Sequence, residues 1–361
     1  MDKEKPIFAV QWHVTSKCDQ RCLHCYIFNS SEPKKSGADL ELASLVKILL
    51  DYFSCCLNLG ALPRLVLSGG DPLLRQDFIA FLDIIAREGK KVGFNDIPID
   101  IMGNPFHLNK ESAKILKEKG VRRYQISVDG MREKHDQIRR PGSFDDSMRA
   151  LDVLIESGIE THVMLTVSKF NAADVIPLIE LLAEKGVDAF AFARFSRPEL
   201  MPIDEYKQVS FAPDEYRSFL VEVDKTYEKL RAEGYKTRFP YKDHLWKLLK
   251  HEEGKLEPLS DPEDGIVYSG CGLGMASVSI LSDGTVYACR RFPSKIGKVP
   301  DQKLEDIFLG SRKLNSFRDL SKYVKCAKCE LLQYCRGCGS VAYGMSGSFF
   351  DPDPQCWKKI D

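Results

Sequence analysis

The sequence predicts an α/β protein in which a partial (β/α)6 barrel is followed by a small cysteine-rich domain. Three observations support this prediction. Between residues 8 and about 197, short β-branched segments alternate with longer amphipathic segments, which is typical of parallel strands joined by helices. Six such repeats are too few for a complete eight-stranded barrel. Beyond residue 269, cysteine and glycine become frequent, as in a small domain held together by its ligands.

The elements can be placed in order along the chain. The expected barrel strands are 8–15, 64–67, 99–102, 124–128, 162–167 and 189–195. The expected barrel helices are 40–53, 77–86, 110–119, 144–156 and 175–184. We assign residues 1–197 to the barrel, 198–268 to a bridge with helices 214–233 and 244–251, and 269–361 to the cysteine-rich domain with strands 277–281 and 285–288. Loops that follow parallel strands are where such folds place their sites.

Composition excludes several classes of protein. The 361 residues include 52 basic and 52 acidic side chains, so no overall charge favours nucleic acid. No apolar run approaches the ~20 residues of a membrane span, and the N-terminus lacks the apolar segment of a signal peptide. We therefore expect a cytoplasmic protein that binds neither nucleic acid nor membrane.

Twelve cysteines in a cytoplasmic chain need an explanation. A reducing compartment disfavours six disulfides, and the cysteines are clustered rather than spread evenly, so we favour metal or cluster ligation. Cys55 and Cys56 lie in a helical pattern and are assigned to packing. The remaining ten form one group of three near the N-terminus and one group of seven after residue 270.

The N-terminal group, Cys18, Cys22 and Cys25, follows the first predicted strand with C-x3-C-x2-C spacing. Three thiolates at this spacing can hold three irons of a [4Fe–4S] cluster and leave the fourth iron without a protein ligand. Zinc is the alternative, but three thiolates without a nearby fourth are unusual for structural zinc. An open iron can bind and activate a second molecule, so this loop predicts catalysis.

This arrangement resembles the radical S-adenosylmethionine (SAM) superfamily. Gly69-Gly70 followed by acidic Asp71 is similar to the motif that holds the SAM amino group in that family, and residues 124–130, 135–144 and 167–171 resemble its later SAM-binding segments. The resemblance implies that the three N-terminal cysteines are catalytic. It also assigns SAM contacts to ten residues: His24, Tyr26, Ser68, Gly69, Gly70, Asp71, Ser127, Asp129, Arg139 and Asn171.

Each of these assignments has a simpler alternative. The glycine pair taken alone is an ordinary turn, as is Asp129-Gly130. Arg139 is preferred for a paired contact with a carboxylate, but Arg140 is its competitor. His24 is expected to contact adenine, although simple packing would also explain it.

The C-terminal cysteines resemble the SPASM domain of radical SAM enzymes, which carries two auxiliary [4Fe–4S] clusters. The resemblance implies an outer cluster on Cys326, Cys329, Cys335 and Cys356, and an inner cluster on Cys271, Cys289 and Cys338. The family usually has three residues between the positions of Cys335 and Cys338, whereas this chain has two. A zinc ribbon is the alternative, but seven cysteines do not divide into four-thiolate sites.

The inner set supplies three ligands, because residues 272–288 contain no cysteine. We hypothesise that its fourth iron binds a substrate thiolate, which stays deprotonated on the metal. In total the resemblance implies SAM and three [4Fe–4S] clusters, one for SAM and two auxiliary.

The favoured function is maturation of a ribosomally made peptide. In this reaction a 5′-deoxyadenosyl radical abstracts hydrogen, and a thioether or carbon–carbon crosslink forms. The alternative is an anaerobic sulfatase-maturating enzyme, which makes formylglycine from Cys or Ser. Such enzymes carry an acid after the position of Cys289, whereas this chain has Arg290-Arg291. A cation cannot take a proton at neutral pH, but it can attract an acidic peptide.

The expected partners are a precursor peptide with a leader, containing cysteine, and a low-potential electron donor such as flavodoxin or ferredoxin. About seven residues precede the first strand, so no winged leader-binding domain is expected there. A third reading, from another class, is a non-catalytic iron–sulfur or zinc protein that does not cleave SAM.

Overall fold

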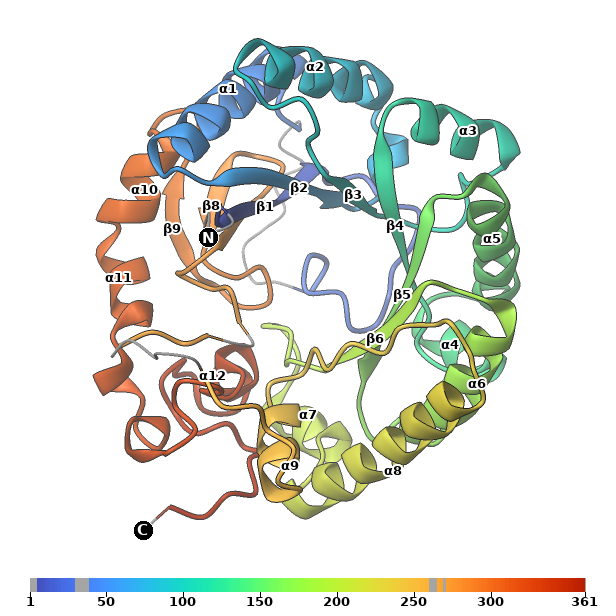
Figure 1. Cartoon of the computed structure of the whole chain (residues 1–361), viewed down its shortest axis with the longest axis vertical. Helices are drawn as coiled ribbons and strands as arrows, with labels where there is room; N and C mark the ends of the chain where they lie inside the picture. The colour runs from blue at the N-terminus through green and yellow to red at the C-terminus, as the bar shows by residue number, and fades with distance from the viewer. Residues whose placement is uncertain (1–4, 30–38, 260–264, 269–270, 361) are drawn as a thin grey trace.

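The computed structural model describes residues 5–29, 39–259, 265–268 and 271–360. The predicted start of the cysteine-rich domain at residue 269 lies outside the described residues. The fold is an α/β barrel segment joined to a small C-terminal domain, as the sequence predicts (Figure 1). No helix among the described residues has the length and apolar character needed to cross a bilayer.

Six parallel strands form the barrel, and each pairs with its neighbour in chain order. They are β1 (Ile7–Thr15), β2 (Leu62–Gly69), β3 (Ile99–Met102), β4 (Val121–Ser127), β5 (Glu160–Val167) and β6 (Ala189–Arg194). Helices cover their outer face: α1 (Leu42–Asn58), α2 (Phe78–Lys91), α3 (Lys110–Glu118), α4 (Arg132–Ile138), α5 (Ser143–Ser157) and α6 (Val175–Lys185). Short 3-10 turns lie at Pro72–Leu74 and Ala172–Asp174.

Alternation of buried side chains explains why these segments become strands. In β1, Phe8, Val10, Trp12 and Val14 are all at most 2% exposed and point to the same face. The opposite face holds the more polar Gln11 and His13, and Gln11 lines a pocket on the inner side of the barrel. The sheet therefore has an apolar face beneath the helices and a polar face for chemistry.

The C-terminal domain extends the barrel sheet. β7 (Ser277–Ile280) pairs parallel with β1, and β8 (Thr285–Tyr287) and β9 (Lys295–Lys298) follow as antiparallel neighbours. The sheet order is β6-β5-β4-β3-β2-β1-β7-β8-β9. The helices of this domain are α10 (Leu304–Gly310), α11 (Arg312–Arg318) and α12 (Gly339–Ser346), with 3-10 turns at Leu320–Lys322 and Cys326–Lys328. In Figure 1 these elements occupy the side of the ring left open by the six barrel strands.

The bridge between the two parts contains α7 (Ile203–Val209), α8 (Pro213–Ala232) and α9 (Trp246–Glu252). α8 packs on α6, and the backbone NH of Phe190 in β6 donates to the carbonyl of Arg238 at 3.0 Å. The bridge is thus packed against the last barrel strand.

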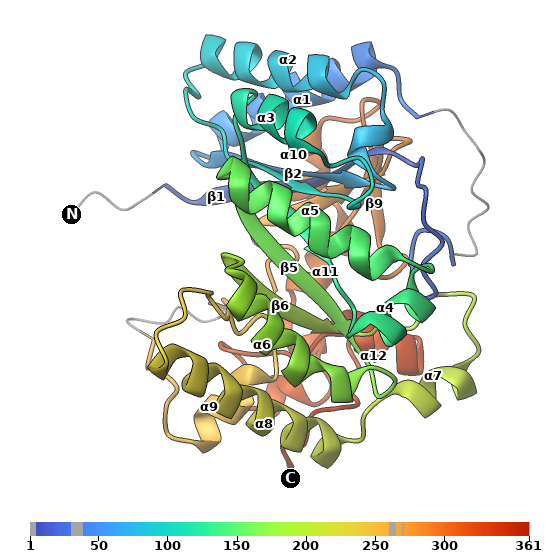
Figure 2. The same ribbon diagram turned by 90° about the vertical axis from the view of Figure 1, so that its right-hand side faces the viewer.

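The carboxyl ends of the barrel strands gather the loops that carry chemistry. Figure 2 shows the N-terminus on one side of the molecule and the loop after β1 on the opposite side. Because the strands are parallel, the loops after β1, β2, β3 and β4 share that edge of the sheet.

Candidate active site

The first cysteine loop is anchored to several barrel loops. Gln20 is buried and its amide donates to Ser143 Oγ at 3.1 Å. The backbone NH of Leu23 donates to the carbonyl of Ile138 at the end of α4, at 2.9 Å. These contacts fix the loop that presents Cys18, Cys22 and Cys25.

Polar donors surround the three thiols. Asn104 Nδ2 lies 3.4 Å from Cys18 Sγ, and Arg139 Nη1 lies 3.6 Å from Cys22 Sγ. Burial raises the pKa of the Cys22 thiol to about 11, against the opposing effect of Arg139. A thiol with such a pKa stays protonated at neutral pH unless a metal displaces the proton, so the loop is suited to ligation rather than to free thiolate chemistry.

The glycine pair allows two loops to touch. A Cβ on Gly70 would lie 1.9 Å from the carbonyl oxygen of Lys17, and a Cβ on Gly69 would lie 2.1 Å from that of Thr15. The loop after β2 therefore packs directly on the cysteine loop. A Cβ at either position would collide with the neighbouring backbone, and both glycines also line the pocket between these loops.

Asp129 organises the opposite wall. Its Oδ2 accepts hydrogen bonds from His24 Nε2 at 2.8 Å and from Arg139 at 2.7 Å, and its Oδ1 accepts from the Thr166 NH at 2.8 Å. Although burial opposes the charge, Arg139 and His24 hold the pKa of this carboxyl well below its usual range. Asn171 supports the turn by donating to the Asp129 carbonyl at 2.7 Å.

Arg139 and Arg140, the two alternatives for a contact with a carboxylate, have different surroundings. Arg139 points inward to the Asp129 carboxylate, and its side chain is 9% exposed. Arg140 instead stacks over the Phe106 ring at 3.3 Å. Both arginines reach the cysteine loop, Arg139 at Cys22 Sγ and Arg140 at the Asp19 carbonyl, and the Arg139 guanidinium is paired with the Asp129 carboxylate.

A pocket lies inside this ring of loops, enclosing about 890 Å³ including space open to solvent. It is lined by all three cysteines and by seven of the ten residues predicted to contact SAM: His24, Tyr26, Ser68, Gly69, Gly70, Ser127 and Arg139. The donor set and the pocket fit a cluster with SAM beside it.

Three predicted contact residues, Asp71, Asp129 and Asn171, do not line this pocket. Asp71 is fully buried behind the wall, where its Oδ1 accepts from the Leu73 NH at 3.2 Å. Burial raises the pKa of Asp71 to about 7. These residues hold the lining loops in place from behind.

Sequence reasoning missed several lining residues, among them Gln11, Met102, Asn104 and Thr166. Asn104 had a detectable signal, because Gly103-Asn104-Pro105 directly follows the third strand at the edge where sites form. Gln11 had a weaker one, as a polar residue within an apolar strand.

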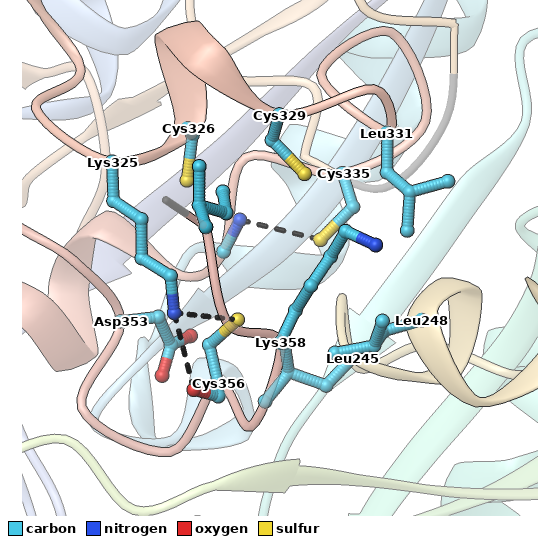
Figure 3. A pocket seen from close by; sticks show the side chains of 12 residues that line it. Leu245, Leu248, Lys325, Cys326, Cys329, Leu331, Cys335, Asp353, Cys356 and Lys358 are labelled. Carbon is cyan, nitrogen blue, oxygen red and sulfur yellow. Dashed lines mark hydrogen bonds between the residues drawn. The ribbon is translucent and has the colours of Figure 1, made fainter. Parts of the chain in front are cut away.

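The outer cysteines converge on one space. Cys326, Cys329, Cys335 and Cys356 line a single pocket beneath α9, and Figure 3 shows their sulfurs turned toward one another. Lys325 Nζ lies 3.6 Å from Cys356 Sγ, and the backbone NH of Gly337 donates to Cys335 Sγ at 3.3 Å. Their location fits the outer cluster that the resemblance implies.

The inner cysteines form a second group. Cys271, Cys289 and Cys338 lie close enough that each affects the ionisation of another. Burial raises the pKa of Cys289 to about 11. Cys338 differs: although burial works against it, Arg291 and His244 lower the pKa of its thiol to about 7. The shortened spacing between Cys335 and Cys338 thus still places these two thiols in different groups.

Sulfur spacing bears on the zinc alternative. Four thiolates around zinc at about 2.3 Å lie ~3.8 Å apart. Among the described residues, the only group of three potential ligands whose atoms lie within 4.8 Å of one another is Asp19, Asp71 and His107, which contains no cysteine. No three cysteine sulfurs among the described residues are thus held within 4.8 Å of one another.

A second pocket adjoins the first, and its lining includes Arg291. Tyr26 and Arg290 line both pockets. Burial raises the pKa of the Tyr26 phenol to about 12. The thiols of Cys25 and Cys289 add to this effect, so both lie near Tyr26. Arg291 contacts the Cys338 sulfur and donates to the carbonyl of Arg194. Arg290 lies over the Tyr26 ring, at the junction where the two pockets meet.

Comparisons with known proteins agree with this architecture. Residues 12–182 match the model of the radical SAM superfamily, and residues 271–339 match SPASM, an iron-sulfur cluster-binding domain. Iron–sulfur clusters and SAM are thus the cofactors of this fold.

The curated relatives include an AdoMet-dependent heme synthase of Methanosarcina barkeri. It is 27% identical over 353 residues, covering 96% of this chain and 95% of the relative. The Fe-coproporphyrin III synthase of the same organism is 26% identical over 375 residues, covering 98% and 88%. The sequence analysis had not considered a tetrapyrrole enzyme.

Two solved structures share the fold. Native anSMEcpe with bound AdoMet has a TM-score of 0.74 at 21% identity, covering 96% of this chain and 93% of its own. Streptococcus suis SuiB bound to S-adenosylmethionine has a TM-score of 0.72 at 17% identity, covering 98% and 78%. These likenesses establish the two-part architecture.

Proposed function

We propose, from the premise that this chain belongs to the radical SAM superfamily and carries a SPASM domain, that it is a peptide maturase which joins a cysteine sulfur to a carbon of its substrate. The observation that carries the proposal is the three-thiol inner set beside the SAM pocket. Three protein ligands leave one iron of a [4Fe–4S] cluster free for a substrate thiolate.

The proposed cofactors are three [4Fe–4S] clusters and SAM. Cys18, Cys22 and Cys25 would hold the SAM-binding cluster, the outer set would hold a fully ligated cluster, and the inner set would hold the third. When bound, these groups supply an electron for reductive cleavage of SAM and an acceptor for the electron that the substrate loses.

The overall reaction balances with these parts. Cys18, Cys22 and Cys25 would hold a cluster with SAM beside it, and with one electron this pair would supply methionine and a 5′-deoxyadenosyl radical able to take a hydrogen atom from a substrate carbon. The cysteine thiol loses its proton, the carbon–sulfur bond forms, and one electron leaves the substrate. The physiological donor for the first electron would be a flavodoxin or ferredoxin.

This chain's own residues would bind and orient the reactants. His24 and Arg139 line the SAM pocket and Asp129 holds both from behind, so His24 and Arg139 would position the nucleotide without reorganising. Tyr26 would separate the two chambers and exclude water between Cys25 and Cys289. Arg290 at the junction would hold an acidic side chain or carboxylate of the substrate.

A second candidate is oxidative loss of carboxyl groups from a porphyrin. It is favoured by the curated relatives, whose names specify heme and Fe-coproporphyrin III synthesis and which align over nearly the whole chain. Arg290 suits this substrate as well, because a guanidinium binds propionate groups in the same paired manner. The inner thiols favour the peptide, since a porphyrin substrate gives a free iron no sulfur to bind.

One assay separates the candidates. Anaerobically reconstituted protein is reduced, given SAM and either a cysteine-containing precursor peptide or Fe-coproporphyrin III, and the products are analysed by mass spectrometry. We expect the peptide to lose two hydrogens and its cysteine to resist alkylation. Loss of carbon dioxide from the porphyrin would establish the second candidate, and an aldehyde on the peptide would establish formylglycine formation. Absence of 5′-deoxyadenosine under all conditions would favour a non-catalytic protein.

A further inference from the structure

Asp71 is the exception among the buried carboxylates of this molecule. Seven Asp and Glu side chains are buried among the described residues, and six of them pair with lysine or arginine. The six paired carboxylates are those of Glu88, Asp100, Asp129, Asp224, Asp243 and Asp353. Asp71 is fully buried, yet its Oδ2 has no hydrogen-bond partner in the part of the chain that the structure describes. A carboxylate in such a position must take up either a proton or a cation.

Two further potential ligands lie beside Asp71. Asp19 Oδ2 is 2.9 Å from His107 Nε2, and one ligand atom each from Asp19, Asp71 and His107 lie within 4.8 Å of one another. The three residues belong to the loops after β1, β2 and β3, which meet at the carboxyl edge of the sheet. Within the described ranges, neither carboxylate forms an ion pair with lysine or arginine. Two carboxylates therefore face one imidazole, and the chain supplies no permanent cation.

The geometry of the three side chains fits a metal ion. Two atoms that each lie ~2.1 Å from one ion, at right angles, are ~3.0 Å apart. The 2.9 Å between Asp19 Oδ2 and His107 Nε2 matches such a pair. The same distance fits a hydrogen bond, but a hydrogen bond between these two residues leaves Asp71 Oδ2 without a partner. One imidazole with two carboxylates suits Mn²⁺, Fe²⁺ or Zn²⁺ better than Mg²⁺ or Ca²⁺, which favour oxygen throughout.

Neighbouring hydrogen bonds orient two of the three side chains. Asn104 Nδ2 donates to Asp19 Oδ1 at 2.6 Å, which directs the other oxygen of that carboxylate toward His107. Ser112 Oγ donates to the His107 carbonyl at 3.0 Å and so holds the loop that precedes α3. Contacts of this kind to the ligands themselves are typical of metal sites.

The group lies outside the SAM pocket, because none of its three residues is among those that line it. The side chains of His107 and Asp19 are 41% and 23% exposed, so a cation can enter from solvent without crossing that pocket. Asn104 connects the two sites, since its Nδ2 also lies 3.4 Å from Cys18 Sγ. A bound cation would offset the negative charge of Asp19 beside Cys18, and the front cluster would be a stronger reductant without it than with it.

We infer that Asp19, Asp71 and His107 bind one divalent cation of the Mn²⁺, Fe²⁺ or Zn²⁺ class and thereby join the first three loops of the barrel. The site is separate from the cysteine groups, since none of its ligands is a thiol. The inference goes beyond the proposed function, because it holds for a peptide or a porphyrin substrate alike.

The test is a titration of reconstituted full-length protein with Mn²⁺, followed by the EPR signal of the free ion. The clusters are kept oxidised, so they give no signal, and their irons occupy the thiols. We expect one equivalent of Mn²⁺ to bind and Zn²⁺ to displace it. SAM should leave the ion bound, and release of Mn²⁺ by SAM would place it in the SAM pocket and contradict the inference.

Two variants remove one ligand each. Asp71→Asn keeps the size of the side chain, and His107→Ala changes a partly exposed one, so the second serves even if the first disturbs folding. Each should weaken Mn²⁺ binding by more than about tenfold, since loss of even an outer contact costs 10–100-fold. A wild-type protein that leaves all Mn²⁺ free, or unchanged affinity in either variant, would overturn the inference and indicate that Asp71 holds a proton.

His162→Ala is the matched control. The His162 imidazole also lies 2.9 Å from a carboxylate, that of Glu160, but Arg123 and Arg238 pair with this carboxylate. The chain thus already supplies the cations there, and the variant should bind Mn²⁺ as the wild type does. An equal loss of affinity in His162→Ala and His107→Ala would mean that exposed histidines bind the ion without a specific site.

A second measurement identifies the ligand directly. Protein labelled with ¹⁵N-histidine is loaded with one equivalent of Mn²⁺, and pulsed EPR of the bound ion is recorded. We expect a nitrogen coupling typical of direct ligation, and we expect His107→Ala to lose it. Absence of this coupling in the wild type would contradict the assignment of His107.

Discussion

The front site and the inner site of this molecule each present three thiols, but their electrostatic surroundings differ. Cys18 and Cys22 lie near the carboxylates of Asp19 and Asp129, which disfavour further negative charge and partly offset the guanidinium of Arg139 beside Cys22. Cys271 and Cys338 lie instead near the guanidinium groups of Arg336 and Arg291.

This difference predicts a division of labour. Negative surroundings destabilise a reduced cluster and make it a strong reductant, as cleavage of a sulfonium requires. Positive surroundings favour the reduced state and make a better electron acceptor. Each site has three thiols, so each cluster would keep one iron without a protein ligand. The neighbouring charges then decide which cluster donates an electron and which accepts one.

The largest expected effect comes from removing the front thiols. Changing Cys18, Cys22 or Cys25 to Ala should abolish 5′-deoxyadenosine formation and remove about a third of the iron, because one cluster of three loses a ligand. Chromatographic assay of 5′-deoxyadenosine and iron analysis check this. Cys55→Ala and Cys56→Ala are the matched controls, since both lie buried in α1 and should retain cleavage. Full activity in a front variant would refute the assignment.

Removing an inner thiol should separate cleavage from product formation. Cys289→Ala is expected to keep SAM cleavage and lose the crosslinked product, because the substrate is no longer held or oxidised at that site. The measurement is the ratio of product to 5′-deoxyadenosine in one reaction. An unchanged ratio would mean that the inner site takes no part in turnover.

The front site depends on a buried ion pair. Arg139→Met leaves the fully buried Asp129 carboxylate without its main partner, and breaking such a pair costs about 3–5 kcal/mol. The midpoint temperature of thermal unfolding should fall accordingly, and the affinity for SAM should fall with it. Arg140→Met, which removes a cation stacked on Phe106, should cost about 1 kcal/mol or less. Similar losses in both variants would contradict the assigned roles.

The smallest effect is expected at the junction of the two pockets. Arg290→Gln should raise KM for an acidic substrate about tenfold, as expected for loss of one hydrogen bond to a charged group. Arg312→Gln, on exposed α11, is the control. Initial rates against substrate concentration at low and high salt check this, and an equal change in both variants would exclude a specific contact.

The fold class could be predicted because periodicity is a local property. The strand expected at 99–102 matches β3 in full, and the other barrel strands and the predicted helices differ from the structure mainly at their ends. The short helices α4, α7, α10, α11 and α12 and strand β9 were missed, since seven or eight residues carry little periodic signal. The pairing of β7 with β1 is a contact between distant segments, which local patterns do not contain.

The site, like the fold, could be predicted where its signal lies in a short stretch of the chain. Cysteine spacing indicated the front group and the C-terminal group of seven, whereas the division of the seven into an outer and an inner set is what the family resemblance implies, because Cys271, Cys289 and Cys338 lie far apart in the chain. The ion pairs of Arg194 with Asp243 and Asp353 were not visible, since each is an ordinary charged residue until the fold brings β6, the bridge and the C-terminus together. The pairing of Arg139 with Asp129 likewise depends on two loops meeting.

The division between the two sites is tested most directly by the effect of SAM on the EPR spectrum of the reduced protein. The comparison uses one variant without Cys18, Cys22 and Cys25 and another without Cys271, Cys289 and Cys338. We predict that SAM changes the spectrum of the second variant and leaves that of the first unaltered. A SAM-dependent change in the variant that lacks the front thiols would contradict the account.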